Sequence, residues 1–113
     1  METRGVFFML LHLGKDRMVL SENIEFILDY NECRKNESSK IFLNKLKKSA
    51  KEVYITKEEI KSLIYIRRNE EERIFYSPIS SATLLKRSDD SFAEYSLVEE
   101  KSDISDLVWK EKI

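Results

Sequence analysis

The sequence predicts a small α+β domain built on a mostly antiparallel sheet, with one longer helix and one or two short helices. Two observations support this class: short apolar runs alternate with turn signals, and one segment repeats its apolar residues at helical spacing. The third observation is the composition. The chain has 113 residues, of which 42% are hydrophobic, and it has only 2 Gly and 1 Pro. We therefore expect one folded domain rather than a loop-rich or disordered chain.

The chain is predicted to begin with a hairpin. Residues 6–13 form a continuous apolar run that ends at Gly14, which is typical of a buried strand. A tight turn then leads into a second strand over residues 17–20. Residues 24–30 are predicted to continue as the third strand of one meander. A helix that begins at Ser21 is the alternative.

The clearest helix is predicted from about residue 38 to residue 51. It follows residues 31–40, which are polar and are predicted as a loop. Its apolar residues recur at spacings of one, three and four, as on one stripe of a helix: Phe42, Leu43, Leu46 and Ala50. Lysines occupy the rest of the helix, and residues 33–51 hold seven basic residues against one acid, Glu37.

The next predicted elements are short. Residues 53–55 form an extended piece, residues 56–61 a polar turn and residues 63–66 a strand. Residues 67–72 are too charged to be buried, so they are predicted as another turn.

Residues 73–87 hold a strand, a proline corner and a short helix. The apolar residues 74–76 favour a strand, and Pro78 ends it because proline has no backbone N–H to donate. Ser80 or Ser81 then caps a helix. The apolar side of this helix is predicted to consist of Ala82, Leu84 and Leu85.

The charge of the chain changes sign after residue 87. Residues 1–87 hold 17 Lys and Arg against 13 Asp and Glu, whereas residues 88–113 hold 3 against 8. The prediction is a domain over 1–87 and a partly docked acidic extension over 88–113, with a short strand or helix near 93–98 and a helix near 103–111. The acids of the extension lead to the hypothesis that it covers the basic helix and reduces DNA binding.

Several kinds of chemistry have little support in the residues. Cys33 and His12 are the only cysteine and histidine, which excludes disulfides within the chain and zinc fingers. Arg34 and Lys35 are expected to lower the pKa of the Cys33 thiol. A passive cysteine, a core or interface histidine and a hydrated acidic run at 70–72 are nevertheless favoured over a redox, catalytic or metal role. We expect no enzyme, no cofactor, no metal and no small-molecule substrate.

Membrane insertion is also not expected. The apolar run at residues 6–13 spans eight residues, which is too short to cross a bilayer, and no convincing signal-peptide cleavage site follows it. A cytoplasmic protein is therefore the expectation.

Four blocks of this sequence resemble the extracellular-matrix regulatory family of bacteria, and its RemB branch most. They are Leu11-His12-Leu13-Gly14, Met18-Val19-Leu20-Ser21-Glu22-Asn23-Ile24, Lys61-Ser62-Leu63-Ile64-Tyr65-Ile66 and Tyr76-Ser77-Pro78-Ile79-Ser80-Ser81-Ala82-Thr83-Leu84-Leu85-Lys86-Arg87. The resemblance covers residues 6–87. It implies a DNA-binding transcriptional regulator of biofilm matrix genes that forms a homo-oligomeric ring and contacts DNA as LytTR-type domains do.

The sequence differs from the family at the expected DNA contacts. The family has arginines just after the second strand and before the strand at 63–66, where this chain has Glu22-Asn23 and Lys57-Glu58-Glu59-Ile60-Lys61. Phosphate contacts are therefore predicted from the basic helix and from the two remaining lysines. The predicted DNA-binding residues are Arg34, Lys35, Lys45, Lys47, Lys48, Lys57 and Lys61. The alternative function is an oligomeric scaffold or protein-interaction module that does not bind DNA.

Overall fold

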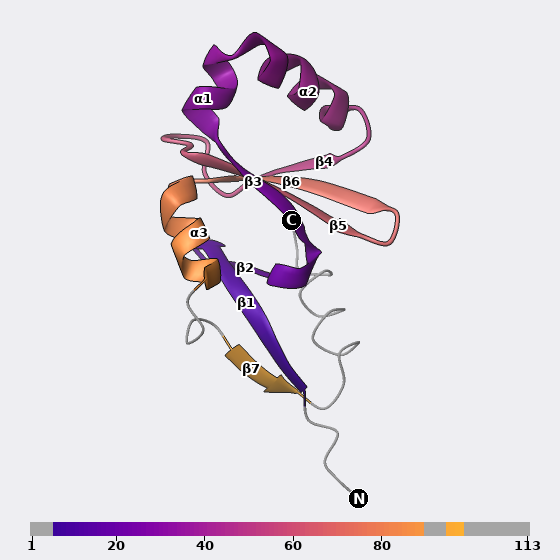
Figure 1. Cartoon of the computed structure of the whole chain (residues 1–113), viewed down its shortest axis with the longest axis vertical. Helices are drawn as coiled ribbons and strands as arrows, with labels where there is room; N and C mark the ends of the chain where they lie inside the picture. Colours follow the sequence, from indigo (N-terminus) through magenta and orange to yellow (C-terminus); the bar gives the residue numbers. More distant parts are fainter. Residues whose placement is uncertain (1–5, 90–94, 99–113) are drawn as a thin grey trace, which may run out of the picture.

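The protein is described by a computed structural model that covers residues 6–89 and 95–98, with side chains for residues 10–88. These residues form two sheets and three α-helices, which confirms the α+β class (Figure 1). In chain order the elements are β1 (Val6–Gly14), β2 (Arg17–Leu20), a 3₁₀ turn (Ser21–Asn23), β3 (Ile24–Asp29), α1 (Tyr30–Lys35), α2 (Glu37–Lys47), β4 (Lys51–Tyr54), β5 (Ser62–Arg68), β6 (Glu71–Ser77), α3 (Ser81–Asp89) and β7 (Tyr95–Val98).

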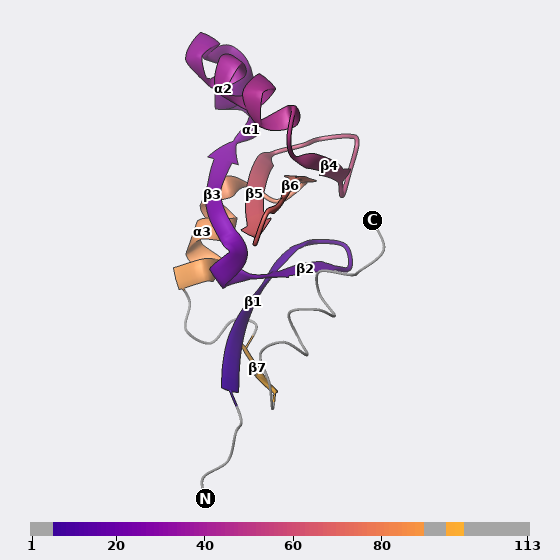
Figure 2. The same ribbon diagram turned by 90° about the vertical axis from the view of Figure 1, so that its right-hand side faces the viewer.

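A four-stranded sheet in the order β3-β5-β6-β4 forms the middle layer. Its β3-β5 and β5-β6 pairs are antiparallel, and its β4-β6 pair is parallel. Helices α1 and α2 lie on one face of this sheet, and the β1–β2 hairpin and α3 lie on the other (Figures 1 and 2). The fold is therefore a sheet covered on both sides.

The sheet has two separate cores because successive side chains of a strand point to opposite faces. In β5, Leu63 and Tyr65 belong to the core under α1 and α2, whereas Ile64 and Ile66 belong to the core under the hairpin and α3. A strand buried on both faces is continuously apolar. This explains why residues 63–66 show no polar alternation.

The hairpin was predicted correctly, but the meander was not. Strands β1 and β2 pair antiparallel around a turn at Lys15 and Asp16. Strand β3 does not pair with β2. The 3₁₀ turn Ser21–Asn23 separates them, and β3 pairs with β5 in the other sheet. Pairing with β5 lets β3 contribute apolar side chains to both cores. Pairing with β2 in the hairpin would not place them in both cores.

The predicted polar loop at residues 31–40 is instead a pair of helices. Asp29 caps α1 by accepting a hydrogen bond from the N–H of Glu32 (2.9 Å). Asn36 ends α1 in an extended conformation and caps α2 by accepting from the N–H of Ser39 (3.0 Å). Asn36 is therefore a helix cap, and the other residues of the predicted loop lie within the two helices. Helix α2 begins one residue before the prediction and ends at Lys47, four residues before it.

The segment after β6 joins the sheet to the hairpin. The Ser77 hydroxyl donates to the Leu13 carbonyl (2.6 Å), and the Ser62 hydroxyl donates to the Ile79 carbonyl (2.6 Å). Gly14, at φ +122°, passes so close to Pro78 that an added Cβ would lie 3.1 Å from the proline Cδ. Glycine suits this position because it tolerates positive φ and leaves room for the ring.

Helix α3 is capped as predicted but buries a different side. Ser80 accepts from the N–H of Thr83 (3.1 Å), so Ser80 rather than Ser81 is the cap. Leu84 is fully buried, whereas Ala82 and Leu85 are exposed. Of the three residues of the predicted apolar side, only Leu84 is buried, because residues one or two positions apart point in different directions around a helix.

Two further predictions concern charged segments. The turn predicted at residues 67–72 contains only Asn69 and Glu70, because β5 extends to Arg68 and β6 begins at Glu71. The element expected near 93–98 is the strand β7, which pairs antiparallel with β1. The helix predicted near 103–111 lies outside the described residues.

Candidate nucleic-acid interface

Helices α1 and α2 carry five of the 17 basic residues of residues 1–87: Arg34, Lys35, Lys40, Lys45 and Lys47. Leu43 and Leu46 of α2 pack against the sheet core, which fixes the orientation of this helix. Lys40, Asn44 and Lys47 follow at spacings of four and three, so they share one flank of α2. The apolar contacts of α2 thus decide where its cations lie.

This flank of α2 borders a pocket between α1, α2 and β4. The pocket has a volume of about 370 Å³ and is lined by three cations and three tyrosines, Arg34, Lys40, Lys47, Tyr30, Tyr54 and Tyr76. Cys33, Leu43 and Asn44 complete its wall, so no carboxylate lines it. The pocket therefore combines positive charge with aromatic surface.

The aromatic part of the pocket is rigidly built. The ring of Tyr54 stacks on the ring of Tyr76 with centroids 4.0 Å apart and planes 4° apart. Tyr30 meets Tyr76 edge-on at 6.2 Å, and the Arg34 guanidinium carbon lies 5.5 Å from the centroid of the Tyr30 ring. Tyr76 is buried, whereas Tyr54 is 45% exposed. A flat and accessible ring therefore stands beside the cations.

One acid stands near the pocket and is already bound. The Tyr76 hydroxyl donates to the Glu52 carboxylate, and the Lys47 ammonium lies 3.8 Å from the same carboxylate. Burial, and then the hydrogen bond to Glu52, raises the pKa of Tyr76 well above its usual range. Tyr76 therefore remains a neutral donor, and Glu52 offsets part of the charge of Lys47.

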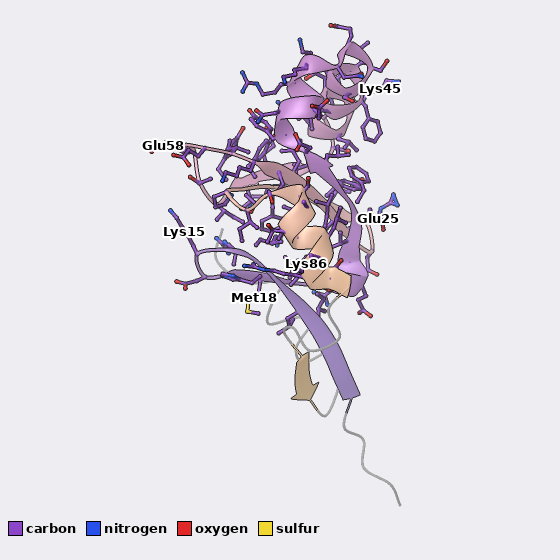
Figure 3. The ribbon with its side chains drawn as sticks, turned by 60° about the vertical axis from the view of Figure 1, so that its left-hand side comes forward. Lys15, Met18, Glu25, Lys45, Glu58 and Lys86 are labelled. Atoms are coloured by element: carbon purple, nitrogen blue, oxygen red, sulfur yellow. The ribbon has the colours of Figure 1, made fainter. Side chains whose placement is uncertain are left out.

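The seven predicted DNA contacts are all exposed, but they do not lie on one face. Arg34 and Lys35 are in the last turn of α1, Lys45 and Lys47 are in the last turn of α2, and Lys48 caps α2. Lys57 and Lys61 lie in the β4–β5 connection. Figure 3 shows Lys45 projecting from α2 on one side and Glu58, the neighbour of Lys57, projecting on the other. The structure thus separates a helix group of five cations from a loop group of two.

Few of the cations in the helix group are paired with a carboxylate. Within residues 6–89 and 95–98, Lys47 alone among the seven predicted cations has an ion pair. The loop group is flanked by Glu58 and Glu59 in sequence. The helix group is therefore the stronger candidate for binding an anionic partner.

Three other residues considered in the sequence, Cys33, His12 and Glu72, have contacts that indicate structural roles. Burial raises the pKa of the Cys33 thiol, and the nearby charge of Lys47 offsets this only in part. The prediction of a lowered pKa was wrong because desolvation outweighs the neighbouring cations. The His12 ring bonds the Lys15 carbonyl in the hairpin turn. Glu72 accepts from the Ser49 hydroxyl (2.9 Å), which ties the end of α2 to β6.

Sequence reasoning did not identify Tyr30, Lys40, Asn44 and Tyr54 as site residues. The spacing of Lys40, Asn44 and Lys47 indicated a common helix flank, and this signal was available. No pattern along the chain indicated that Tyr30 and Tyr54 would meet this flank, because α1, α2 and β4 come together only in the folded sheet.

Strand β7, the strand of the acidic extension, lies far from this site. Strand β7 pairs with β1, and both views place it beyond the hairpin, on the side of the four-stranded sheet opposite α1 and α2 (Figures 1 and 2). The hypothesis that the extension covers the basic helix is not tested by this placement, because residues 99–113 lie outside the described part.

Comparisons with known proteins identify no relative. No model of a known family, no curated protein and no solved structure matches the chain. Within the described residues, no helix has the length and apolar character needed to cross a bilayer. The same residues contain no group of three or more side chains suited to hold a metal ion.

Proposed function

We propose that this protein is a DNA-binding transcriptional regulator that acts as a homo-oligomeric ring in the bacterial cytoplasm and controls biofilm matrix genes. The family resemblance of residues 6–87 is the origin of this proposal. The observation that carries it is the helix group of exposed cations, Arg34, Lys35, Lys45, Lys47 and Lys48, in which only Lys47 has an ion pair among the described residues.

Clustered cations favour a polyanion over a single small anion. Each phosphate that a Lys or Arg neutralises releases condensed counterions, and this release strengthens binding at low salt. Lysines on a helix surface act as point charges, so they position a duplex along its backbone and do not read its bases. We therefore expect binding with weak sequence preference from the helix group.

A ring increases the effect of a small patch. Five cations per subunit are few, but a closed assembly repeats them and presents them to one duplex. Each further contact then forms within a complex that already exists, which raises the overall affinity. Oligomerisation is therefore an integral part of the proposal.

One observation favours the alternative of an oligomeric scaffold. Ile41 is 54% exposed and Phe42 is 46% exposed on α2, and the Phe42 ring lies 5.6 Å from that of Phe26 on the edge strand β3. Exposed apolar side chains beside an edge strand are typical of contacts between proteins. This surface is compatible with a ring contact as well as with a scaffold.

The test is duplex DNA binding by the purified protein, titrated over salt, beside its mass in solution. We expect the logarithm of the affinity to fall linearly with the logarithm of the salt concentration. The double variant Lys45→Glu with Lys48→Glu should weaken binding and reduce this slope by about 2 for each subunit that contacts the duplex. Lys47 is left unchanged because its ion pair with Glu52 would complicate the result.

Two matched variants control this experiment. Lys57→Glu with Lys61→Glu removes the loop group, and a larger effect of this pair would move the surface to the β4–β5 connection. Lys86→Glu changes an exposed lysine on α3, on the other side of the sheet (Figure 3), and should leave the slope unchanged. A stable ring that binds no duplex at low salt would contradict DNA binding and favour the scaffold.

A further inference from the structure

We propose that the pocket between α1, α2 and β4 binds a nucleotide unit, with its phosphate at Arg34 and Lys40 and its base stacked on Tyr54. The pocket shares Arg34 and Lys47 with the helix group, whereas Lys40, Asn44 and the tyrosines belong to the pocket alone. The duplex proposal depends on the exposed charge of the helix group, whereas the nucleotide proposal depends on the shape and chemistry of the pocket wall.

The size of the pocket fits a small ligand. Its volume of about 370 Å³ lies in the range of small-molecule sites, roughly 300–1,000 Å³. Leu43 and the rings of Tyr30, Tyr54 and Tyr76 supply apolar surface, and the Asn44 amide supplies both donors and an acceptor. Such sites usually join an apolar wall to a few polar groups.

The charge of the wall selects an anion. Arg34, Lys40 and Lys47 line the pocket, and no carboxylate does. Glu52 is bound to Tyr76 and lies 3.8 Å from Lys47, so it offsets that lysine. Arg34 and Lys40 have no ion pair within the described residues. A guanidinium with a nearby ammonium suits a phosphate group, because Arg can donate two parallel hydrogen bonds to it.

The aromatic side of the wall selects a flat group. Tyr54 is stacked on Tyr76 through one ring face, and no other aromatic ring of the described residues stacks on it. Because Tyr76 is buried and hydrogen-bonded to Glu52, it holds Tyr54 in place. A ring that is already fixed loses little entropy when a base stacks on it. Phosphate and a flat ring together define a nucleotide.

Two sources offer this chemistry, a free nucleotide and an unpaired nucleotide of a strand. The test is therefore isothermal titration calorimetry of the full chain with four probes: adenosine 5′-monophosphate, adenosine, inorganic phosphate and a single-stranded oligoadenylate. We expect the monophosphate to bind at least about tenfold more tightly than adenosine or phosphate alone, since it makes both contacts. If the oligoadenylate binds more tightly than the monophosphate, the ligand of the pocket is an unpaired nucleotide of a strand rather than a free nucleotide.

Variants separate the two contacts. Lys40→Gln should weaken monophosphate binding about tenfold, which is the lower range for a charged hydrogen bond. Tyr54→Leu should weaken the monophosphate about tenfold and leave inorganic phosphate unchanged. Tyr54→Phe keeps the ring and should retain binding, which distinguishes a stacking role from a loss of folding. Circular dichroism of each variant checks the fold.

Lys45→Gln is the matched control, because it removes an equal charge from α2 outside the pocket wall. Equal losses in Lys45→Gln and Lys40→Gln would show a diffuse charge effect and overturn the proposal. The absence of binding to all four probes would overturn the proposal as well. The variants that test the pocket, at Lys40 and Tyr54, differ from those that test the duplex surface, at Lys45 and Lys48, so failure of either proposal leaves the other testable.

Discussion

The two faces of the four-stranded sheet are covered in different ways. The face under the hairpin and α3 is mostly aliphatic and closed, with Leu11, Ile64 and Leu84 fully buried and Phe75 as the aromatic residue of this core. The face under α1 and α2 is aromatic, holds a cavity and carries the exposed cations. Both faces bury a hydrophobic core, and the helical face in addition carries the pocket and the exposed cations. Substitutions on the closed face should therefore affect stability alone, whereas substitutions on the helical face should also affect binding.

The largest effect is expected on the closed face. Leu84→Ala removes a fully buried side chain from α3 and leaves a cavity, so the free energy of unfolding should fall by about 2–5 kcal/mol. Urea unfolding followed by circular dichroism measures this change.

Leu85→Ala is the matched control for this substitution. It lies in the same helix, but Leu85 is 50% exposed, so the change should stay within about 0.5 kcal/mol. Equal losses from the two variants would contradict the description of this face as closed. Neither variant should alter binding of adenosine 5′-monophosphate.

A smaller effect is expected where the sheet is joined to the hairpin. Ser77→Ala removes the hydroxyl that donates to the Leu13 carbonyl and accepts from the N–H of Ile79 (3.0 Å). Ser77 is fully buried, so both partners lose this bond without gaining water. The free energy of unfolding should fall by about 1–3 kcal/mol in the same urea experiment. An unchanged stability would show that the Ser77 hydroxyl contributes little to holding the hairpin on the sheet.

On the helical face, one substitution should change stability and binding in opposite directions. Glu52→Gln removes the charge that holds the Tyr76 hydroxyl and Lys47, and stability should fall by about 1 kcal/mol. The same change leaves Lys47 without its counter-charge, so the affinity for adenosine 5′-monophosphate should rise. Urea unfolding and titration of one preparation measure both effects. Parallel losses in stability and binding would contradict the role of Glu52 as a counter-charge that weakens anion binding at Lys47.

Elements that are set by residues close together in the sequence were predicted, whereas pairings between residues far apart in the sequence were not. The hairpin, β5 and α2 were predicted because each shows its own period or turn signal within about ten residues. Helix α1 was missed because Cys33 is its single buried residue, so its sequence has no apolar stripe. The partner of β3 was missed because β3 and β5 are separated by both helices and by β4. Local patterns do not contain such pairings.

The candidate site divides in the same way. The cations of α2 were recognised from composition, because a run of lysines on one helix is a local signal. The pocket was not recognised, since Tyr30, Lys40 and Tyr54 come from three elements that meet only after folding. Charge is therefore more easily predicted from a sequence than the cavity beside it.

The smallest effect concerns the pH dependence of the helical face. The Glu72 carboxylate accepts hydrogen bonds from Tyr65 and Ser49, and these bonds hold its pKa below the usual value of 4.5. A carboxyl whose pKa is lower in the folded state stabilises the fold above the unfolded pKa, and this contribution is lost as the pH falls through the folded pKa. Wild-type stability should therefore decline below about pH 4.5.

Glu72→Gln should make this decline shallower, because the amide keeps an acceptor and does not titrate. The difference between the two proteins is expected to be small since Glu72 is near the surface, and urea unfolding at a series of pH values from neutral to acid measures it. Glu70→Gln, in the exposed β5–β6 turn, is the matched control and should follow the wild type. A parallel decline in all three proteins would assign the acid sensitivity to other carboxylates, and would remove Glu72 from the ties that hold α2 to the sheet.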